Sequence, residues 1–468
     1  MELKELYPNI KLNIEIQGIT CDSRKVNKGY IFVAIKGKKT DGNKFIDEAI
    51  RNGASFIVTN KIHFKENFIY SANPKLEYIR LLKIFYNYTK IYTIGITGTD
   101  GKTTSSTILY SILNEINPSA YIGTNGISYL KNNIPTKNTT PSPEIFYKAN
   151  NEFQACKVHD LVMEVSSEGI LDKRVEGINY DGAIFTNLSH EHLNTHKNMK
   201  NYFLCKAKLF ESLDRTSLLV INIDDPYSKK IYKHTDAKII TYGFKESATY
   251  SVHNYKITAK GSMFEVYYNN KFLSNFHIYL FGKYNIYNAL SAIAYAYEIG
   301  IPINYIQSGL HKIHSVNGRF MVYKNNDIEY IIDYAHTPNA LKNLLDNVNE
   351  IKKGRTILVL GAAGEKDSSK RQALGEIATT LADITIFTSE DPKNESIFQI
   401  MSDLTSRVKG DYYLTLSRFD AIKLAKSLAN KNDIVLITGK GNEKTEIIKN
   451  YIFHHSDSDL LKKALGIS

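Results

Sequence analysis

The segment from Ile91 to Thr104 carries residue types that can hold a polyphosphate. It reads IYTIGITGTDGKTT, an apolar β-branched run followed by glycines and a Lys-Thr pair that opens a helical pattern. Glycines let backbone N–H groups turn toward an anion, and the helix N-terminus adds partial positive charge. Lys102 is placed to reach the outer phosphates, and the Thr103 hydroxyl to ligate Mg²⁺. The spacing departs from the standard P-loop, since Ile96 stands at its first glycine position, so a ligand-free strand–helix turn is the alternative.

Two further predicted strands end in polar residues. LVMEVSSEG places Glu164 at the end of one strand, and AIFTNLSHEHLNTH places His192 after another. Ligands of parallel α/β sheets lie at the carboxyl ends of strands. A carboxylate and an imidazole can hold a divalent ion near transferring phosphates, so we predict Glu164 and His192 as metal ligands. For the neighbouring His190 and His196 we favour ordinary surface loop positions.

Lys206 lies in a helical pattern, four residues after Tyr202 and four before Phe210, so it shares their face. A lysine on an apolar face often extends its charged head to solvent. A desolvated lysine instead has a lowered pKa, and its neutral amine can take up CO₂ to become a metal-binding carbamate. The spacing alone leaves both interpretations open.

Several polar residues elsewhere permit more than one role. Asn285 and Asn288 are three apart at a predicted helix start, where they could contact an adenine edge or cap the helix. Arg319 could bring a guanidinium to a phosphate. Asp333 ends a predicted strand beside other polar groups. Ser23 lies in Asp-Ser-Arg next to a turn, where spacing alone favours simple capping.

Composition limits the class of protein. The 468 residues include 59 Lys+Arg and 48 Asp+Glu, a net charge of +11, but the lysines are scattered and no nucleic-acid-binding motif accompanies them. A solvated lysine-rich surface is therefore favoured over nucleic-acid binding. Three cysteines form neither a disulfide framework nor a metal cluster, and no signal peptide or membrane span is evident. We expect a cytoplasmic protein.

The order of predicted elements indicates an α/β protein of three domains. Residues 1–88 form a small α/β domain, 89–316 a parallel sheet with crossover helices, and 317–468 a Rossmann-like βα repeat. The third segment lacks GxGxxG, which disfavours a nicotinamide cofactor. The main predicted helices are 45–52, 103–116 and 338–351. The predicted strands are 30–35, 55–59, 120–123, 160–165, 182–188, 217–223, 238–242, 330–333, 356–361, 384–388, 412–415 and 434–438.

The motifs together resemble one family along the whole chain. They are DSRKV, FVAIKG, DGNKFIDEAIRNGA, GITGTDGKTT, NTTPSPE, MEVSSEG, TNLSHEHLNTH, YFLCKAKLF, INIDDP, FGKYNIYN, NGRF, IDYAHTP, GAAGEKDSSKR, TSEDPKNE and ITGKGNE. The chain resembles the Mur ligases, and most of all the MurE group. This resemblance implies three domains, binding UDP-substrate, ATP and amino acid in turn. It implies ATP-dependent, Mg²⁺-assisted addition of a diamino acid, meso-diaminopimelate being favoured, to UDP-N-acetylmuramoyl-L-alanyl-D-glutamate in peptidoglycan synthesis.

The resemblance also implies roles for individual residues. The implied catalytic residues are Lys102, Glu164, His192 and Lys206, and the implied Mg²⁺ ligands are Thr103, Glu164, His192 and carbamylated Lys206. The ATP-binding positions are Gly98, Thr99, Asp100, Gly101, Lys102, Thr103, Thr104, Asn285, Asn288, Arg319 and Asp333. The UDP-muramoyl-dipeptide positions are Ser23, Asn138, Thr139, Thr140, Ser166 and Arg174. The incoming amino acid is matched to Lys366, Glu390, Asp391, Pro392, Lys393, Gly439 and Glu443.

The sequence departs from the family pattern at several motif positions. Asp100 replaces a usual Asn, Glu168 and Asn442 replace usual histidines, and Glu191 and Asn194 replace usual aspartates. These departures leave open a degenerate, regulatory Mur-like protein.

The departures at the amino-acid positions bear on the substrate. The diaminopimelate signature DNPR reads Glu390–Lys393 here, EDPK, and Lys366 stands where arginine is common. Arginine binds a carboxylate bidentately, whereas lysine offers a point charge. L-lysine, which lacks the extra carboxylate, is therefore an alternative amino acid. A folylpolyglutamate-synthase-like ligase and a nucleotide-gated binding protein are the rival functions. We expect a monomer that binds no nucleic acid.

Overall fold

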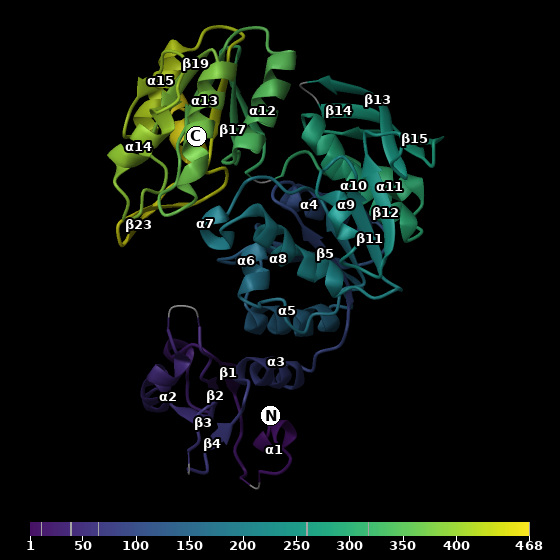
Figure 1. Cartoon of the computed structure of the whole chain (residues 1–468), viewed down its shortest axis with the longest axis vertical. Coiled ribbons are helices and arrows are strands. Elements are labelled where there is room, and N and C mark those ends of the chain that lie inside the picture. The colour runs from purple at the N-terminus through teal and green to yellow at the C-terminus, as the bar shows by residue number, and fades with distance from the viewer. Residues whose placement is uncertain (11, 38–39, 64, 259–260, 317, 468) are drawn as a thin grey trace. The chain divides into compact units, whose positions relative to one another are not determined.

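The computed structural model describes residues 1–10, 12–37, 40–63, 65–258, 261–316 and 318–467. The chain forms two compact units, whose helices and strands are labelled in Figure 1. The first comprises residues 1–93, 118–161 and 168–179, and the second comprises residues 94–117, 162–167 and 180–468. Each unit is described by itself below.

The first unit is built around a small parallel sheet whose strands follow chain order, β1-β2-β3-β4. Its inner residues, such as Ile31 and Phe56, are fully buried. Strands β6, β7 and β8 pair antiparallel in the same unit. The strands are β1 (Gly18–Thr20), β2 (Tyr30–Val33), β3 (Ala54–Thr59), β4 (Phe68–Tyr70), β6 (Ser119–Gly123), β7 (Gly126–Tyr129) and β8 (Asn132–Ile134). The helices are α1 (Leu3–Leu6), η1 (Ser23–Lys25), η2 (Gly42–Phe45), α2 (Ile46–Arg51), α3 (Pro74–Phe85) and α5 (Pro143–Ala155).

A larger sheet carries the phosphate loop. Its order in the second unit is β15-β14-β13-β12-β11-β10-β5-β9, parallel from β5 through β12 to β13 and antiparallel over β13, β14 and β15. The strands are β5 (Tyr92–Thr97), β9 (Asp160–Glu164), β10 (Gly182–Phe185), β11 (Leu218–Asn222), β12 (Lys238–Gly243), β13 (Tyr250–Thr258), β14 (Gly261–Tyr268) and β15 (Lys271–Ile278). The helices are α4 (Lys102–Leu113), α6 (Ser167–Leu171), α7 (Leu193–His196), α8 (Met199–Glu211), α9 (Ser228–Ile231), α10 (Lys283–Glu298) and α11 (Ile303–His311).

The C-terminal segment of the second unit has a sheet of order β16-β17-β21-β18-β19-β20. Only its edge strand β16 runs antiparallel to its neighbour. The strands, with a separate antiparallel hairpin β22–β23, are β16 (Met321–Asn325), β17 (Ile328–Asp333), β18 (Thr356–Leu360), β19 (Ile384–Phe387), β20 (Tyr413–Leu414), β21 (Ile434–Thr438), β22 (Thr445–Ile448) and β23 (Tyr451–His454). The helices are α12 (Pro338–Ile351), η3 (Ser368–Lys370), α13 (Arg371–Leu381), α14 (Ile397–Thr405), α15 (Arg418–Leu428) and α16 (Asp457–Leu465).

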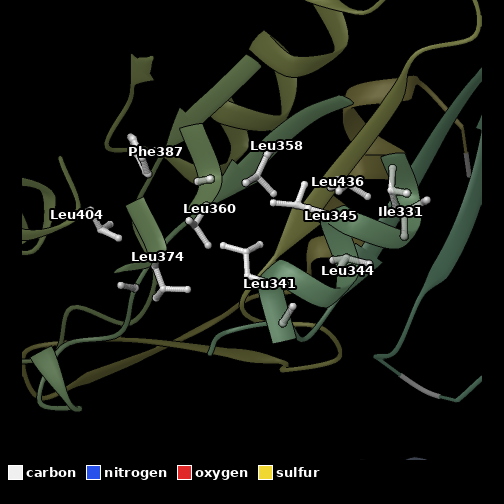
Figure 2. Close-up of a cluster of buried hydrophobic side chains, with 14 of the residues drawn as sticks. Ile331, Leu341, Leu344, Leu345, Leu358, Leu360, Leu374, Phe387, Leu404 and Leu436 are labelled. Atoms are coloured by element: carbon white, nitrogen blue, oxygen red, sulfur yellow. The ribbon is translucent and has the colours of Figure 1, made fainter. Parts of the chain in front are cut away.

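Helices cover both faces of this C-terminal sheet. Figure 2 shows Leu341, Leu344 and Leu345 of α12 pointing toward Leu358 and Leu436 of the strands. The opposite face packs on α15 and α16 through a second buried cluster. Alternate strand residues enter the two clusters, as expected for a sheet buried on both sides. The Rossmann-like prediction for this segment is confirmed by its strand order and layers.

Every predicted strand and helix is present, with small shifts at the ends. The largest are of three residues: α4 ends at Leu113 instead of residue 116, and β10 ends at Phe185 instead of residue 188, because the next residues bond to the phosphate loop. The antiparallel β13–β15 extension and the β22–β23 hairpin were not predicted. The parallel sheet expected for residues 89–316 is present from β5 to β13, and it continues into the antiparallel strands β14 and β15. Asn317 of the NGRF motif lies outside the described residues. No helix in the described part of the chain is long and apolar enough to span a membrane.

Candidate functional site

In the glycine loop, the side chain of Lys102 is hydrogen-bonded to the loop's own backbone. Gly101 precedes α4 with a left-handed φ of 83°, and a side chain there would collide with the amide oxygen of Asn288. Lys102 begins the helix and folds back, its Nζ donating 2.8 Å hydrogen bonds to the carbonyl oxygens of Gly98 and Thr99. Burial lowers the pKa of Lys102, and the nearby Glu164 carboxylate opposes that shift. A phosphate bound here would replace the carbonyl oxygens as partner of the ammonium.

The segment after β10 holds this loop in place. The backbone N–H of Thr99 donates to the carbonyl oxygen of Asn187 at 2.9 Å, and that of Asp100 donates to the Asn187 side chain at 2.9 Å. Thr186 Oγ1 donates to the carbonyl oxygen of Asp100 at 2.6 Å. Burial raises the pKa of Asp100. Asn187 therefore holds the loop through both its backbone and its side chain, a role for which the sequence analysis gave no signal.

Thr103 and Glu164, both named above as magnesium ligands, lie in contact. The Thr103 hydroxyl donates a 3.0 Å hydrogen bond to Glu164 Oε2, and both side chains are buried. The contact follows from strand order, because Val165 just beyond β9 donates its N–H to Ile96 of β5 at 2.8 Å. A hydroxyl and a carboxylate therefore lie together at the start of α4.

Lys206 is buried on α8, as its spacing allowed. Its Nζ donates to the carbonyl oxygen of Gly98 at 2.8 Å and lies 4.9 Å from the centre of the Tyr202 ring. Burial, with repulsion from Lys102, lowers the pKa of Lys206 well below its ordinary value. The solvent-extended interpretation of this lysine is wrong, since the side chain is only 2% exposed.

His192 has the chemistry of a metal ligand in its neutral form. Burial, then repulsion from Lys206 and Lys102, lowers the pKa of His192 to about 3, so the imidazole is neutral at physiological pH. Its ring makes an edge contact with Tyr202, 6.0 Å between centres. His196 is not the surface loop residue we expected: it is buried and packs on the same tyrosine, 4.7 Å between centres. His190 is exposed, as favoured.

The implied magnesium site can be tested against this donor set. In the described residues no cluster of three or more His, Cys, Asp or Glu side chains is arranged for a metal ion. The hydroxyl of Thr103, the carboxylate of Glu164 and neutral His192 are suitable ligands, but Lys102 and Lys206 beside them would repel a cation in their protonated, ammonium form. Converting Lys206 to a carbamate would replace an amine by an anionic oxygen ligand. The residues therefore fit Mg²⁺ with Lys206 in that form.

The remaining residues that were predicted to bind ATP lie on α10, on α4 and next to β17. Asn285 and Asn288 are buried on α10 and bond to each other at 3.0 Å, while Gly282 occupies the N-cap. Contact of these amides with adenine stays a prediction, and capping is excluded as their role. Arg319 stacks its guanidinium on the Tyr334 ring at 4.3 Å. Asp333 accepts hydrogen bonds from two backbone N–H groups, and burial raises its pKa while Arg319 opposes that shift. Thr104 is buried on α4.

Most of the residues predicted to bind the incoming amino acid lie at strand ends of the C-terminal sheet. Asp391 Oδ1 accepts a 2.8 Å bond from Lys440, which also bonds to Glu443 at 3.2 Å. Gly439 has φ 110°, and a side chain there would collide with the Glu390 carboxyl group. Burial raises the pKa of Glu390 to about 7, and its Oε2 has no hydrogen-bond partner among the described residues. Lys440, fully buried, was missed by the sequence analysis.

Two lysines and a proline complete this region. Lys393 has φ 52° and ties the β22–β23 hairpin to its segment, its N–H donating to Ile447 at 3.0 Å. Lys393 and Pro392 line a cavity of about 730 Å³ in the C-terminal segment. Lys366 is exposed, close enough to His192 to lower that residue's pKa.

The predicted muramoyl-site residues are mostly in the first unit. Ser23 donates to Glu48 at 2.6 Å. Arg174 donates to the carbonyl oxygen of Thr140 at 3.0 Å. Thr139 contacts the hydroxyl of Thr124 at 3.1 Å, and the carbonyl oxygen of Asn138 accepts a 3.1 Å bond from Thr136. Ser166 belongs to the second unit, two residues after the end of β9.

Known proteins match this chain along its length. Residues 15–92 match the profile described as Mur ligase family, catalytic domain; residues 96–296 match the Mur ligase middle domain; and residues 318–441 match the Mur ligase, glutamate ligase domain. A UDP-N-acetylmuramoyl-L-alanyl-D-glutamate--2,6-diaminopimelate ligase 1 from Clostridium acetobutylicum is 35% identical over 99% of both chains. The chain belongs to the Mur ligase family. A Clostridium tetani protein with the corresponding diaminopimelate ligase name is also 35% identical over 99% of both chains.

Solved structures agree with the Mur ligase fold. A structure of a UDP-N-acetylmuramoyl-L-alanyl-D-glutamate--2,6-diaminopimelate ligase covers 100% of this chain with a TM-score of 0.68 and 26% identity. MurF ligase from Thermotoga maritima in complex with ADP gives 0.71 at 18% identity over 96% of this chain, a likeness of fold alone. Folylpolyglutamate synthase from Mycobacterium tuberculosis covers only 77% of it. This Mur ligase is therefore an α/β protein with N-terminal, middle and C-terminal Mur ligase domains.

Proposed function

We propose that this Mur ligase uses ATP to join 2,6-diaminopimelate to UDP-N-acetylmuramoyl-L-alanyl-D-glutamate in the cytoplasm, as a step of peptidoglycan synthesis. The observation that carries the proposal is the 35% identity, over 99% of both chains, to a relative with that name. The buried lysines and acidic residues at the glycine loop support it, because they suit a triphosphate and a cation. We propose domain bounds of 1–88, 89–316 and 317–468, and a monomer.

The first chemical step is transfer of a phosphoryl group. An oxygen of the D-glutamate γ-carboxylate attacks the γ-phosphorus of ATP, the bond from that phosphorus to ADP breaks, and an acyl phosphate forms. Lys102 leaves the carbonyl oxygens of Gly98 and Thr99 and neutralises the charge on the transferred group. Thr103, Glu164, His192 and carbamylated Lys206 would hold Mg²⁺, which supplies electrostatic stabilisation of the phosphates when bound.

The second step is attack of an amine on the acyl carbon. The amino nitrogen forms the amide bond, inorganic phosphate leaves with the electron pair, and the amine loses a proton. Glu390 is suited to hold an ammonium group of the incoming amino acid, because its buried carboxyl has an oxygen without a hydrogen-bond partner. Asp391, Lys440 and Glu443 form the ion-pair network that fixes the neighbouring backbone.

L-lysine is the second candidate amino acid. Lys393 and Lys366 stand where arginines would grip the extra carboxylate of diaminopimelate bidentately. A point charge at these positions can still attract that carboxylate, so diaminopimelate remains the first candidate. The names of the full-length relatives favour it as well.

A panel of amino acids tests the proposal. Purified protein with ATP, Mg²⁺ and UDP-N-acetylmuramoyl-L-alanyl-D-glutamate receives meso-diaminopimelate, L-lysine or L-ornithine, and both phosphate release and product mass are measured. We expect phosphate release and a UDP-muramoyl-tripeptide with diaminopimelate. Turnover with folate and glutamate instead would favour a folylpolyglutamate-synthase-like ligase. Salt-sensitive retention of RNA or DNA in a gel shift, without any turnover, would favour a nucleotide-gated binding protein.

A further inference from the structure

Both chain neighbours of His192 are bonded to one short segment of the C-terminal domain. Glu191 accepts hydrogen bonds of 2.9 and 3.1 Å from Lys370 Nζ. The backbone N–H of Leu193 donates to Asp367 Oδ2 at 3.3 Å. His192 lies between these two contacts, so the position of its backbone depends on residues about 175 places further along the chain.

The Glu191–Lys370 pair is buried on both sides. The two side chains are 4% and 7% exposed, so water screens their attraction little and neither charge can be rehydrated in place. Removing one partner leaves an unpaired buried charge. Burial raises the pKa of Glu191, and Lys370 opposes that shift by its charge and hydrogen bonds. The contact is therefore unlike the many exposed lysine–carboxylate pairs of this chain.

The backbone of His192 requires such support. Its φ of 58° lies in the left-handed region, which costs free energy for any residue other than glycine. The helix that follows, α7, has only four residues and cannot fix this geometry alone. On its other side the segment is tied to the phosphate loop, because the Ser189 N–H donates to Thr99 Oγ1 at 3.0 Å.

The anchoring segment, residues 367–370, has hydrogen bonds and ion pairs of its own within the C-terminal domain. Asp367 Oδ1 accepts from the backbone N–H of Ser369 at 3.1 Å and so caps η3. Arg371, which follows, is 1% exposed and bonds to Glu395 and Asp403. The segment 367–370 is thus bonded both to the C-terminal domain and to the loop that carries His192.

We propose that Lys370 and Glu191 form a latch through which docking of the C-terminal domain sets His192 in its metal-binding position. They are positioning residues: they act through His192 and the backbone around it. Undocking breaks the pair and frees the backbone of His192 to leave its left-handed conformation. The cation site is then complete only when the domain that brings the amino acid is in place. This inference rests on the proposed function, because it takes His192 as a metal ligand.

The test compares Lys370→Met, Glu191→Gln, the double variant and Lys370→Arg. Lys352→Met is the matched control, since Lys352 pairs with Asp383 within the C-terminal domain, away from the site. Hydrogen exchange of residues 189–197 and binding of Mn²⁺ in the presence of ADP are measured on the full chain. Thermal unfolding identifies any variant that fails to fold. If Lys370→Met is such a variant, Glu191→Gln is compared with the wild-type protein instead, because it leaves Lys370 and the packing of α13 unchanged.

We expect each single variant to exchange residues 189–197 about tenfold faster and to bind Mn²⁺ roughly tenfold more weakly. The double variant should match the single variants because the two residues act together, and Lys370→Arg should restore both values. Wild-type exchange and Mn²⁺ affinity in Lys370→Met and Glu191→Gln would overturn the latch. If the wild-type protein formed no amide product, the proposed function would be wrong. The hydrogen-exchange rates of the variants would still test whether Lys370 and Glu191 hold the loop.

Discussion

Lys102 and Lys206 donate to the same atom: the carbonyl oxygen of Gly98 accepts a 2.8 Å hydrogen bond from the Nζ of each. Two buried amines on one carbonyl oxygen are an unfavourable arrangement when both are charged. Burial lowers the pKa of both lysines, and repulsion by Lys102 adds to the shift of Lys206. Two changes would relieve this arrangement. A bound phosphate would attract Lys102 away from the carbonyl oxygen of Gly98, and carbamylation would make the side chain of Lys206 anionic and able to bind a cation.

We predict that Lys206 forms a carbamate. Burial lowers its pKa and so favours the neutral amine, which is the form that adds CO₂. Protein equilibrated with ¹³C-labelled bicarbonate should show a carbamate carbon by NMR that is absent in Lys206→Ala. Lys208→Ala is the control, since Lys208 is exposed on the same helix. A carbamate carbon that persists in Lys206→Ala would contradict the assignment.

Lys102→Ala should abolish turnover while leaving the fold intact. The side chain bonds only to loop carbonyl oxygens among the contacts described, so its removal costs little stability, but the transferred phosphoryl group loses its cation. We expect a loss of about 10³-fold or more in kcat, measured by phosphate release. Unchanged thermal unfolding would show that the fold survives. Near-normal kcat in this variant would remove the glycine loop from catalysis.

Helices and strands were predicted from the sequence more accurately than contacts between side chains distant in the chain. The β5–α4 turn and helix α12 follow from local pattern, and their observed bounds match to within three residues. Lys206 was placed on its helix by spacing, but its burial depends on packing against Tyr202 and Gly98. No local pattern reports such packing, which is why extension into solvent and carbamylation could not be separated from the sequence.

Residues that act by bonding to distant segments were the ones missed. Asn187 fixes the phosphate loop 87 positions away in the chain, and Lys440 pairs with Asp391 across two strand ends. His196 looked like a loop residue because its segment is polar, yet its ring packs on Tyr202. The β13–β15 strands alternate polar and apolar residues weakly, and their pairing is set by register with each other.

Glu390 should make amino-acid binding depend on pH. Burial raises the pKa of this carboxyl to about 7, so it is mostly protonated at pH 6 and mostly ionised at pH 8. If the carboxylate holds an ammonium group, KM for diaminopimelate should fall by up to about tenfold between these pH values. Glu390→Gln should remove this dependence. The same pH dependence in Glu390→Gln would exclude the carboxyl from binding.

The pKa of Glu390 also has a consequence for stability. Because the folded-state value lies above the unfolded one, ionisation is less favourable in the folded protein. Its contribution to the free energy of unfolding is present below pH 4.5 and is lost as pH rises through about 7. Glu390→Gln should therefore be relatively more stable than wild type at pH 8 than at pH 5, by urea unfolding. An equal difference at both pH values would contradict the assigned pKa.

Lys393→Ala should raise KM for diaminopimelate more than KM for L-lysine. The lysine offers a charge to the extra carboxylate of diaminopimelate, which L-lysine lacks. We expect roughly a tenfold change for diaminopimelate and about twofold for L-lysine, on the scale of one charged hydrogen bond. Lys409→Ala, at an exposed lysine paired with Glu376, is the control. Equal changes for both amino acids would remove Lys393 from carboxylate binding.

The C-terminal domain should depend strongly on one buried ion pair. Arg418 donates two 2.6 Å hydrogen bonds to Asp457, and both side chains are almost fully buried. Arg418→Met removes the guanidinium and leaves the buried carboxylate with His455, at 2.9 Å, as its remaining ionisable partner, so we expect a loss of about 3–5 kcal/mol in the free energy of unfolding. Lys409→Met breaks an exposed pair and should cost about 1 kcal/mol or less. Similar urea midpoints for the two variants would contradict this contrast.

The central claim is that a carboxyl oxygen of the muramoyl substrate attacks the γ-phosphorus of ATP. Isotope transfer tests it directly: the D-glutamate γ-carboxylate of UDP-N-acetylmuramoyl-L-alanyl-D-glutamate is labelled with ¹⁸O, and the phosphate released with diaminopimelate is analysed by mass spectrometry. The account predicts one ¹⁸O atom in each phosphate released. Phosphate without ¹⁸O, at a turnover equal to amide formation, would contradict it.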